Sequence, residues 1–364
     1  NSNPILTDVS IENNSSWQGC GLSLYSSNPT LTNVEINNNY GNSANSEGGG
    51  IYLDESSSPI LNYVLIKGNT AENGGGIQID GSSLTLNNIL IEGNSAGSSG
   101  GGLRILYSSP NITNAIIKGN SAGHEGGGIS MIGSSPTFSN VLIKGNTAEN
   151  GGGIFIQGNT SIPSMNDVTI VENFGSNGAG VAFFNSYDPN FNNVNIVYNN
   201  GVGIVLEGSN STPQISNVNI IGNEIGIRAK SGTNPTILNS NILNNGYGLY
   251  NEGTLNINTA TNNYWGHSSG PYHPSQNSTG QGDSVNAFVN VDPWLTAPNT
   301  DAPPIPAQNT TVTSTGNDFI SLKWDASPLG DLAGYKLYYD SDSSGYPYAN
   351  SVDIGTDTSY TLSS

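Results

Sequence analysis

Short segments of alternating apolar and polar residues recur along most of the chain. Each of them follows a glycine, as in "IYLD" from Ile51, "IQID" from Ile77 and "LRIL" from Leu103. This period of two is typical of a strand with one buried face. Two further apolar segments follow in each repeat, as in "SPIL" and then "NVLI". Because no helical pattern separates them, we expect three short parallel strands per repeat.

The repeat is about 26 residues long, and "IKGNTAENGGGI" occurs twice, at residues 66–77 and 143–154. A period of 20 to 50 residues indicates a solenoid, in which each unit buries its apolar face by stacking on its neighbours. One asparagine marks the period in every repeat. These asparagines are Asn14, Asn39, Asn69, Asn94, Asn120, Asn146, Asn173, Asn199, Asn223 and Asn245.

The aligned asparagines predict an inward-facing ladder. Asn tolerates the left-handed backbone conformation that a tight turn requires, and its amide both donates and accepts hydrogen bonds. Stacked once per coil, each side chain can bond the next and satisfy groups that no water reaches. The glycine before each strand allows a positive φ angle or a close approach between coils.

These repeats resemble those of secreted bacterial parallel β-helix proteins. The combination of "GGGIS" with "TFSN" is similar to the repeats of chlamydial polymorphic outer-membrane proteins, and more broadly to the pectate-lyase-like superfamily. "NNYWGHSSGP" and "VDPWL" resemble the last coil of such proteins, with Tyr264, Trp265 and Trp294 covering the core. The resemblance implies an all-β, right-handed parallel β-helix of about ten to eleven coils over residues 1–297. Function does not follow from this fold alone.

A second domain is predicted after a change in composition. Residues 298–307 are proline-rich and typical of a linker. Residues 308–364 resemble a fibronectin type III module, with Trp324 on the second strand and Tyr338 on the third. Such a module needs about seven strands in roughly 100 residues. Only about five fit here, so we expect a partial β-sandwich.

Composition narrows the functional classes. The formal net charge is −19, from 27 acidic and 8 basic residues, which argues against a nucleic-acid partner. The single Cys20 forms no internal disulfide. No apolar stretch of 18 residues occurs, so we expect no membrane span in this sequence. Together with the resemblance, this favours a secreted or cell-surface bacterial protein.

The outward positions of the first strand of each repeat contain one candidate catalytic group. Asp54 and Asp80 fall on neighbouring coils, and Arg104 falls one coil further on. Adjacent carboxylates raise each other's pKa or bind a hard cation such as Ca²⁺, and an arginine relieves their repulsion. The group is therefore either an acid–base pair or a Ca²⁺-assisted site of a polysaccharide lyase or hydrolase with Arg104 as the base, or a surface charge cluster.

Aromatic residues on the same outward positions are the candidate binding residues: Tyr52, Phe155, Phe184 and Tyr250. Exposed aromatic rings on a flat sheet suit stacking on sugar rings or burial against a partner. Loops folded over the sheet are the alternative. A further row of equivalent positions contains Lys67, Glu92, Lys118 and Lys144, which predicts a solvated charge ladder.

The sequence favours a non-catalytic structural or adhesion protein without a cofactor, and leaves a carbohydrate-binding or carbohydrate-active protein as the alternative. The expected partners are surface glycans or other copies of the chain. The first repeat begins in mid-coil, and an uncovered coil would present unpaired backbone groups to another chain. Head-to-tail contacts of that kind propagate without closing, so a subunit of an extracellular fibre is a further expectation.

Overall fold

The computed structural model describes residues 2–54, 56–158, 161–185, 190–208, 211–230, 232–253, 257, 259–329, 332–340, 348 and 350–363. The chain divides into two compact units, Asn1–Ala302 and Pro303–Ser364, and the boundary lies within the predicted linker. The described residues contain strands and no helix, so none of them forms a helix that could cross a membrane.

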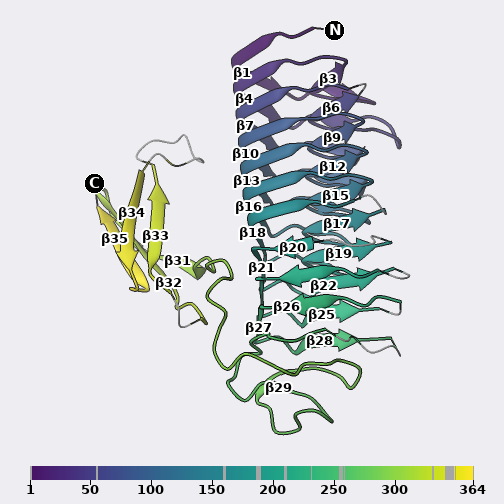
Figure 1. Cartoon of the computed structure of the whole chain (residues 1–364). Coiled ribbons are helices and arrows are strands. Elements are labelled where there is room, and N and C mark those ends of the chain that lie inside the picture. Colours follow the sequence, from purple (N-terminus) through teal and green to yellow (C-terminus); the bar gives the residue numbers. More distant parts are fainter. Residues whose placement is uncertain are drawn as a thin grey trace. The chain divides into compact units, whose positions relative to one another are not determined.

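The first unit is a parallel β-solenoid built on two main sheets, which stack their strands along one axis (Figure 1). Sheet 1 contains β1 (Ile5–Glu12), β4 (Thr30–Asn37), β7 (Ile60–Lys67), β10 (Thr85–Glu92), β13 (Asn111–Lys118), β16 (Thr137–Lys144), β18 (Ser164–Val171), β21 (Val194–Val197), β24 (Asn219–Ile221) and β27 (Asn241–Leu243). Sheet 2 contains β3 (Leu22–Tyr25), β6 (Ile51–Asp54), β9 (Ile77–Asp80), β12 (Leu103–Leu106), β15 (Ile129–Ile132), β17 (Ile154–Gln157), β19 (Val181–Phe184), β22 (Val202–Glu207), β25 (Ile225–Ala229) and β28 (Tyr247–Asn251).

Ten strands in each described main sheet correspond to about nine turns, fewer than the ten or eleven coils expected. The two apolar segments expected to be separate strands form one strand in most coils. In β10, Asn88 has a φ of 56° and drops out of the pairing register, while Asn87 and Ile89 on either side remain paired. A single left-handed residue thus bends the strand without ending it.

A third strand follows the ladder asparagine in the first five coils, where the sequence lacks a clear apolar alternation. Sheet 3 contains β2 (Ser15–Ser16), β5 (Tyr40–Gly41), β8 (Thr70–Asn73), β11 (Ser95–Ser99) and β14 (Ser121–Ala122). A fourth small sheet, split from the long strands of the later coils, contains β20 (Asn190–Asn192), β23 (Gln214–Ser216) and β26 (Thr236–Leu238). A parallel pair, β29 (Pro271–Tyr272) and β30 (Gly282–Ser284), lies after the last coil.

The inward positions of sheets 1 and 2 form one continuous apolar core. In β12, Leu103 and Ile105 are fully buried, and both pair in register with inward residues of β9 and β15. Trp265 is fully buried in the same core, and Trp294 packs against it. The two tryptophans therefore take part in covering the last coil, as the sequence predicts.

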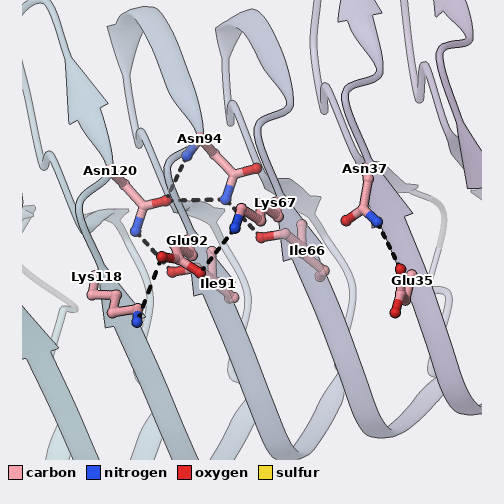
Figure 2. A network of polar contacts seen from close by, with 9 residues as sticks. All are labelled: Glu35, Asn37, Ile66, Lys67, Ile91, Glu92, Asn94, Lys118 and Asn120. Atoms are coloured by element: carbon pink, nitrogen blue, oxygen red, sulfur yellow. Dashed lines mark hydrogen bonds and ion pairs between the residues drawn. The ribbon is translucent and has the colours of Figure 1, made fainter. Parts of the chain in front are cut away.

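The asparagine ladder runs inside the corner that follows sheet 1. Asn94 shows its pattern: Nδ2 donates to Asn120 Oδ1 at 3.0 Å and to the carbonyl of Ile66 at 2.9 Å, and the backbone N–H donates to Asn120 Oδ1 at 2.9 Å (Figure 2). The same pattern repeats at Asn39, Asn69, Asn120, Asn146, Asn173, Asn199 and Asn223. All of these side chains are buried.

One expectation about the ladder is wrong. The ladder asparagines do not adopt the left-handed conformation; the residue before each of them does, as at Gly93 with a φ of 63° and Gly145 with 62°. The turn is therefore made by the residue before the ladder asparagine, which is the glycine of "GN" in some coils and a residue such as Glu172 or Tyr198 in others. Asn94 and Asn146 remain free to direct their amides inward along the axis.

The second unit contains small antiparallel sheets. One contains β31 (Gln308–Thr315), β32 (Phe319–Asp325) and β35 (Ser359–Ser363), and the other β33 (Tyr335–Tyr339) and β34 (Asn350–Gly355). Trp324 of β32 is buried, and its ring meets Tyr335 edge-on at 5.4 Å between centroids. Tyr338 lies on β33 as expected but is 56% exposed, so Tyr335 is the tyrosine of this core.

Candidate functional site

A backbone bend covers part of the outward face of sheet 2. Gly48, Gly74 and Gly100 have φ angles of 63°, 60° and 70° and precede β6, β9 and β12. A Cβ on Gly74 would lie 2.7 Å from Cβ of Gln78, and one on Gly100 the same distance from Cβ of Arg104. Only glycine fits so close to a neighbouring side chain while keeping a positive φ. We call this bend, together with the start of the strand that follows it, the elbow.

The elbow buries the first outward position of β6, β9, β15 and β17, whereas the corresponding Arg104 of β12 is partly exposed. Gln78 and Ser130 are fully buried there. The expectation that the aromatic residues at this position face solvent is therefore wrong: Tyr52 is 4% exposed and Phe155 only 2%. Burial also raises the pKa of the Tyr52 hydroxyl, with the nearby Asp54 as the next cause. These two rings stabilise the solenoid and do not present a stacking surface to a ligand.

The second outward position is more open. Phe184 is partly exposed and its ring packs at a tilt against Phe155, at 5.3 Å between centroids. The Lys230 ammonium lies 5.8 Å from the Phe184 ring centroid. Tyr250 is at the first outward position of β28, where it pairs with Arg228, but it is partly exposed and meets Tyr247 edge-on at 5.5 Å between centroids. Of the four predicted binding aromatics, Phe184 and Tyr250 keep a solvent-facing surface.

Asp54 and Asp80 lie on neighbouring coils, as predicted. Leu53 pairs with Ile79, which aligns the two aspartates one residue further on. Arg104 does not continue their row, because Asp80 pairs with Leu106 and Arg104 pairs with Gln78. Burial raises the pKa of Asp80, with Asp54 and Glu47 as further causes.

Arg104 lies deeper in the elbow than the sequence suggests. Burial lowers the pKa of its guanidinium, while Glu47, Glu125 and Asp80 act in the opposite direction. One terminal nitrogen, Nη1, donates to Gln78 Oε1 at 3.5 Å. Its neighbours Glu47 and Glu125 precede the glycine bends and were not among the predicted site residues. The triple glycine that follows each of them is the sequence signal for the bend.

Three successive coils carry unpaired polar atoms in this elbow. Gln78 Nε2, Arg104 Nε and Ser130 Oγ have no hydrogen-bond partner among the described residues. Leaving a buried donor unpaired costs about 1–3 kcal/mol, so unpaired groups of this kind often mark functional positions. The same described residues contain no group of three or more His, Cys, Asp and Glu side chains arranged to hold a metal ion.

The predicted charge row lies on the outward face of sheet 1. Glu92 lies between two lysines, with its carboxylate oxygens 3.6 Å from Lys67 Nζ and 3.5 Å from Lys118 Nζ (Figure 2). Lys144 pairs with Glu172 at 3.1 Å. These side chains are between 30% and 54% exposed, so each ion pair contributes little to stability.

The solenoid and its repeated ladders place the chain among the parallel β-helix proteins. The family described as the right handed beta helix region matches residues 1–120 and 111–265, which is more than half of the chain. The chain therefore belongs to the family of right-handed β-helix proteins. Comparisons with curated proteins and with solved structures gave no match.

Proposed function

We propose that this protein is a non-catalytic structural or adhesion protein of the bacterial cell exterior. The observation that supports it most directly is the continuous ladder along the axis, in which Asn69, Asn94 and Asn146 each bond the next coil in the same way. Side chains bonded from coil to coil suit a stiff spacer or scaffold. Within the β-helix family, the "GGGI" and "TFSN" repeats favour the pectate-lyase-like superfamily and a likeness to chlamydial polymorphic outer-membrane proteins.

The candidate catalytic residues give weaker support to an enzyme. Arg104 lies behind the Gly100 bend and is offset from the row that contains Asp54 and Asp80. A general base has to reach the proton that it removes, within about 3 Å or through one water. Arg104 instead interacts with Gln78 and with the acidic residues around it.

A polysaccharide assay tests this proposal. We expect the full chain to produce no unsaturated uronate ends from a panel of uronate polysaccharides, with or without added Ca²⁺, and no new reducing ends from neutral ones. Asp80→Asn should behave like the unmodified protein. Turnover that disappears in Asp80→Asn would show that the protein is an enzyme.

Carbohydrate binding is the second candidate function. It is favoured by Tyr25, which is 41% exposed and pairs with Asp54 of the neighbouring coil. Its ring packs at a tilt against Tyr52, at 5.8 Å between centroids. An exposed ring next to hydrogen-bonding groups suits a sugar. Glycan-array binding that is lost in Tyr25→Ala or Phe184→Ala, but kept in the exposed control Tyr107→Ala, would support this function.

The second unit supports a modular extracellular protein. Its antiparallel sheets, with Trp324 packed on Tyr335, are compatible with part of a fibronectin type III-like sandwich. We infer that this unit is a spacer or adhesion module. If glycans of the array bind only to chains that retain residues 303–364, this unit is the one that recognises them.

A further inference from the structure

An apolar row crosses four coils on the outward face of sheet 1. Leu65, Leu90, Ile116 and Leu142 pair in register on β7, β10, β13 and β16, and each is partly exposed. Parallel strands lie about 4.8 Å apart, so the row is about 14 Å long. It runs along the solenoid axis and is one side chain wide. We call it the aliphatic row.

The charge row borders the aliphatic row two residues further along each strand. It contains three of the eight basic residues of the chain, Lys67, Lys118 and Lys144. With Glu92 and Glu172 its formal charge is 3 − 2 = +1, whereas the chain carries −19. The positive edge beside an apolar surface favours an acidic partner.

The same outward column continues on the later coils, where a segment of the chain itself contacts it. Leu142 pairs with Thr169, and the column continues through Asn195 and Asn219 to Asn241. Asn241 Nδ2 donates to the carbonyl of Asn299 at 3.0 Å, and Asn241 Oδ1 accepts from the backbone N–H of Asn299 at 2.7 Å. One side-chain amide thus binds both backbone groups of a single residue.

This contacting segment, residues 295–302, runs along the axis and not along the strands. The Leu295 N–H donates to the carbonyl of Asn263, and four residues later Asn299 reaches Asn217, one coil before Asn241. Pro298 precedes Asn299. The outward face of sheet 1 therefore already accepts a proline-containing segment that crosses successive coils.

The size of the aliphatic row indicates which kind of partner could bind there, a second folded copy or an extended segment. A stable interface between two folded copies buries about 800 Å² on each partner. Four partly exposed side chains in a row about 14 Å long provide much less. A polyproline II segment matches the row better, because its residues three apart lie about 9.3 Å from each other. That distance is close to two coils, or about 9.6 Å.

We propose that the aliphatic row and the charge row together form a docking site for an extended, proline-rich, acidic polypeptide segment. Apolar side chains three residues apart in the segment contact every second coil, for example at Leu65 and Ile116. Acidic side chains between them have the same spacing of two coils and face Lys67 and Lys118. The site is independent of whether the solenoid is a spacer or a glycan-binding protein.

Fluorescence anisotropy on the full chain tests this site, with a labelled peptide of four Pro-Asp-Leu repeats as the probe. We expect saturable binding below about 1 mM, weakened about tenfold by Ile116→Asp and, independently, by the exposed charge reversal Lys118→Glu. Leu106→Asp is the matched control, because Leu106 is a partly exposed outward residue of sheet 2. It should leave binding unchanged.

A peptide of four Pro-Lys-Leu repeats should not bind, since its charge matches that of the row. Circular dichroism would verify that each variant is folded. If Ile116→Asp does not fold, Lys118→Glu still tests the site. The proposal is wrong if the acidic peptide does not bind at about 1 mM. It is also wrong if folded row variants bind as well as the Leu106→Asp control, or if both peptides bind equally.

Discussion

Asp283 occupies the place that the next asparagine would take in the inner ladder. Its Oδ2 accepts from Asn245 N at 3.0 Å and from Asn245 Nδ2 at 2.8 Å, which is the pattern that Asn120 offers to Asn94. Burial raises the pKa of Asp283 from 3.8 to about 6, although its hydrogen bonds to Asn245 act in the opposite direction. The sequence could not reveal this residue, because it lies 38 positions after Asn245 and outside the period.

We predict that Asp283→Asn stabilises the protein at neutral pH. The raised pKa means that the folded state holds this proton more tightly than the unfolded chain does. The stabilisation from Asp283 is complete below about pH 4 and is lost as the pH rises through about 6. Such a shift corresponds to about 3 kcal/mol at most, and partial exposure reduces it to roughly 1–2 kcal/mol. Asparagine keeps both hydrogen bonds without the charge.

Urea unfolding at several pH values measures this effect. The gain of Asp283→Asn should be present at neutral pH and absent near pH 4. Asp167→Asn, which makes the same charge change at an exposed position of β18, should show neither. A gain that is independent of pH would mean that the Asp283 carboxyl is not the cause.

At the scale of the strand, glycines set how closely the coils stack. A Cβ on Gly128 would lie 2.6 Å from the carbonyl oxygen of Gly153 in the next coil, whereas Gly145 has a φ of 62° with open space around its Cβ position. Gly128 is required because a side chain would clash with the next coil. Gly145 is required because its backbone has a positive φ. In the sequence, Gly128 belongs to the "GGG" before a strand and Gly145 to the "GN" before a ladder asparagine. The repeat predicts a glycine at both points but does not show which of the two reasons applies.

Gly128→Ala should therefore destabilise the protein more than Gly145→Ala. A left-handed alanine costs about 1–2 kcal/mol. Gly128→Ala must also separate two coils whose backbone hydrogen bonds hold them together, so its cost should exceed that of Gly145→Ala. Paired measurements of the free energy of unfolding check this order. Equal losses would show that the coils can move apart at little cost.

The alternation of apolar and polar residues predicts only in part which strand residues are buried. Ile51 and Leu53 face inward as the period of two requires, and Tyr52 points away from the core. Its burial depends on the bend at Gly48, which folds over the sheet from the preceding corner. A strand pattern carries no information about such a cover. For this reason Tyr52 and Phe155 were misplaced at the surface, while Phe184 was not.

At the scale of the whole molecule, the stability of the solenoid depends on contacts between neighbouring coils. Each coil contacts mainly its neighbours, so the total is approximately a sum of coil and interface terms. The period of the sequence predicts this architecture well, because one residue type recurs at the same point of each coil. The binding surfaces follow from contacts such as Asn241 with Asn299, which join positions 58 residues apart and leave no periodic signal.

The free energy of unfolding of Asn146→Ala, in the middle of the ladder, tests the account most directly. Asn146 Oδ1 accepts from Asn120 N and Nδ2, and its own Nδ2 donates to the carbonyl of Ile117. Each buried group left unpaired costs about 1–3 kcal/mol, so we predict a loss of about 3 kcal/mol or more. Lys144→Ala, two residues earlier and outward, should lose less than about 1 kcal/mol. Equal losses would contradict the inward ladder.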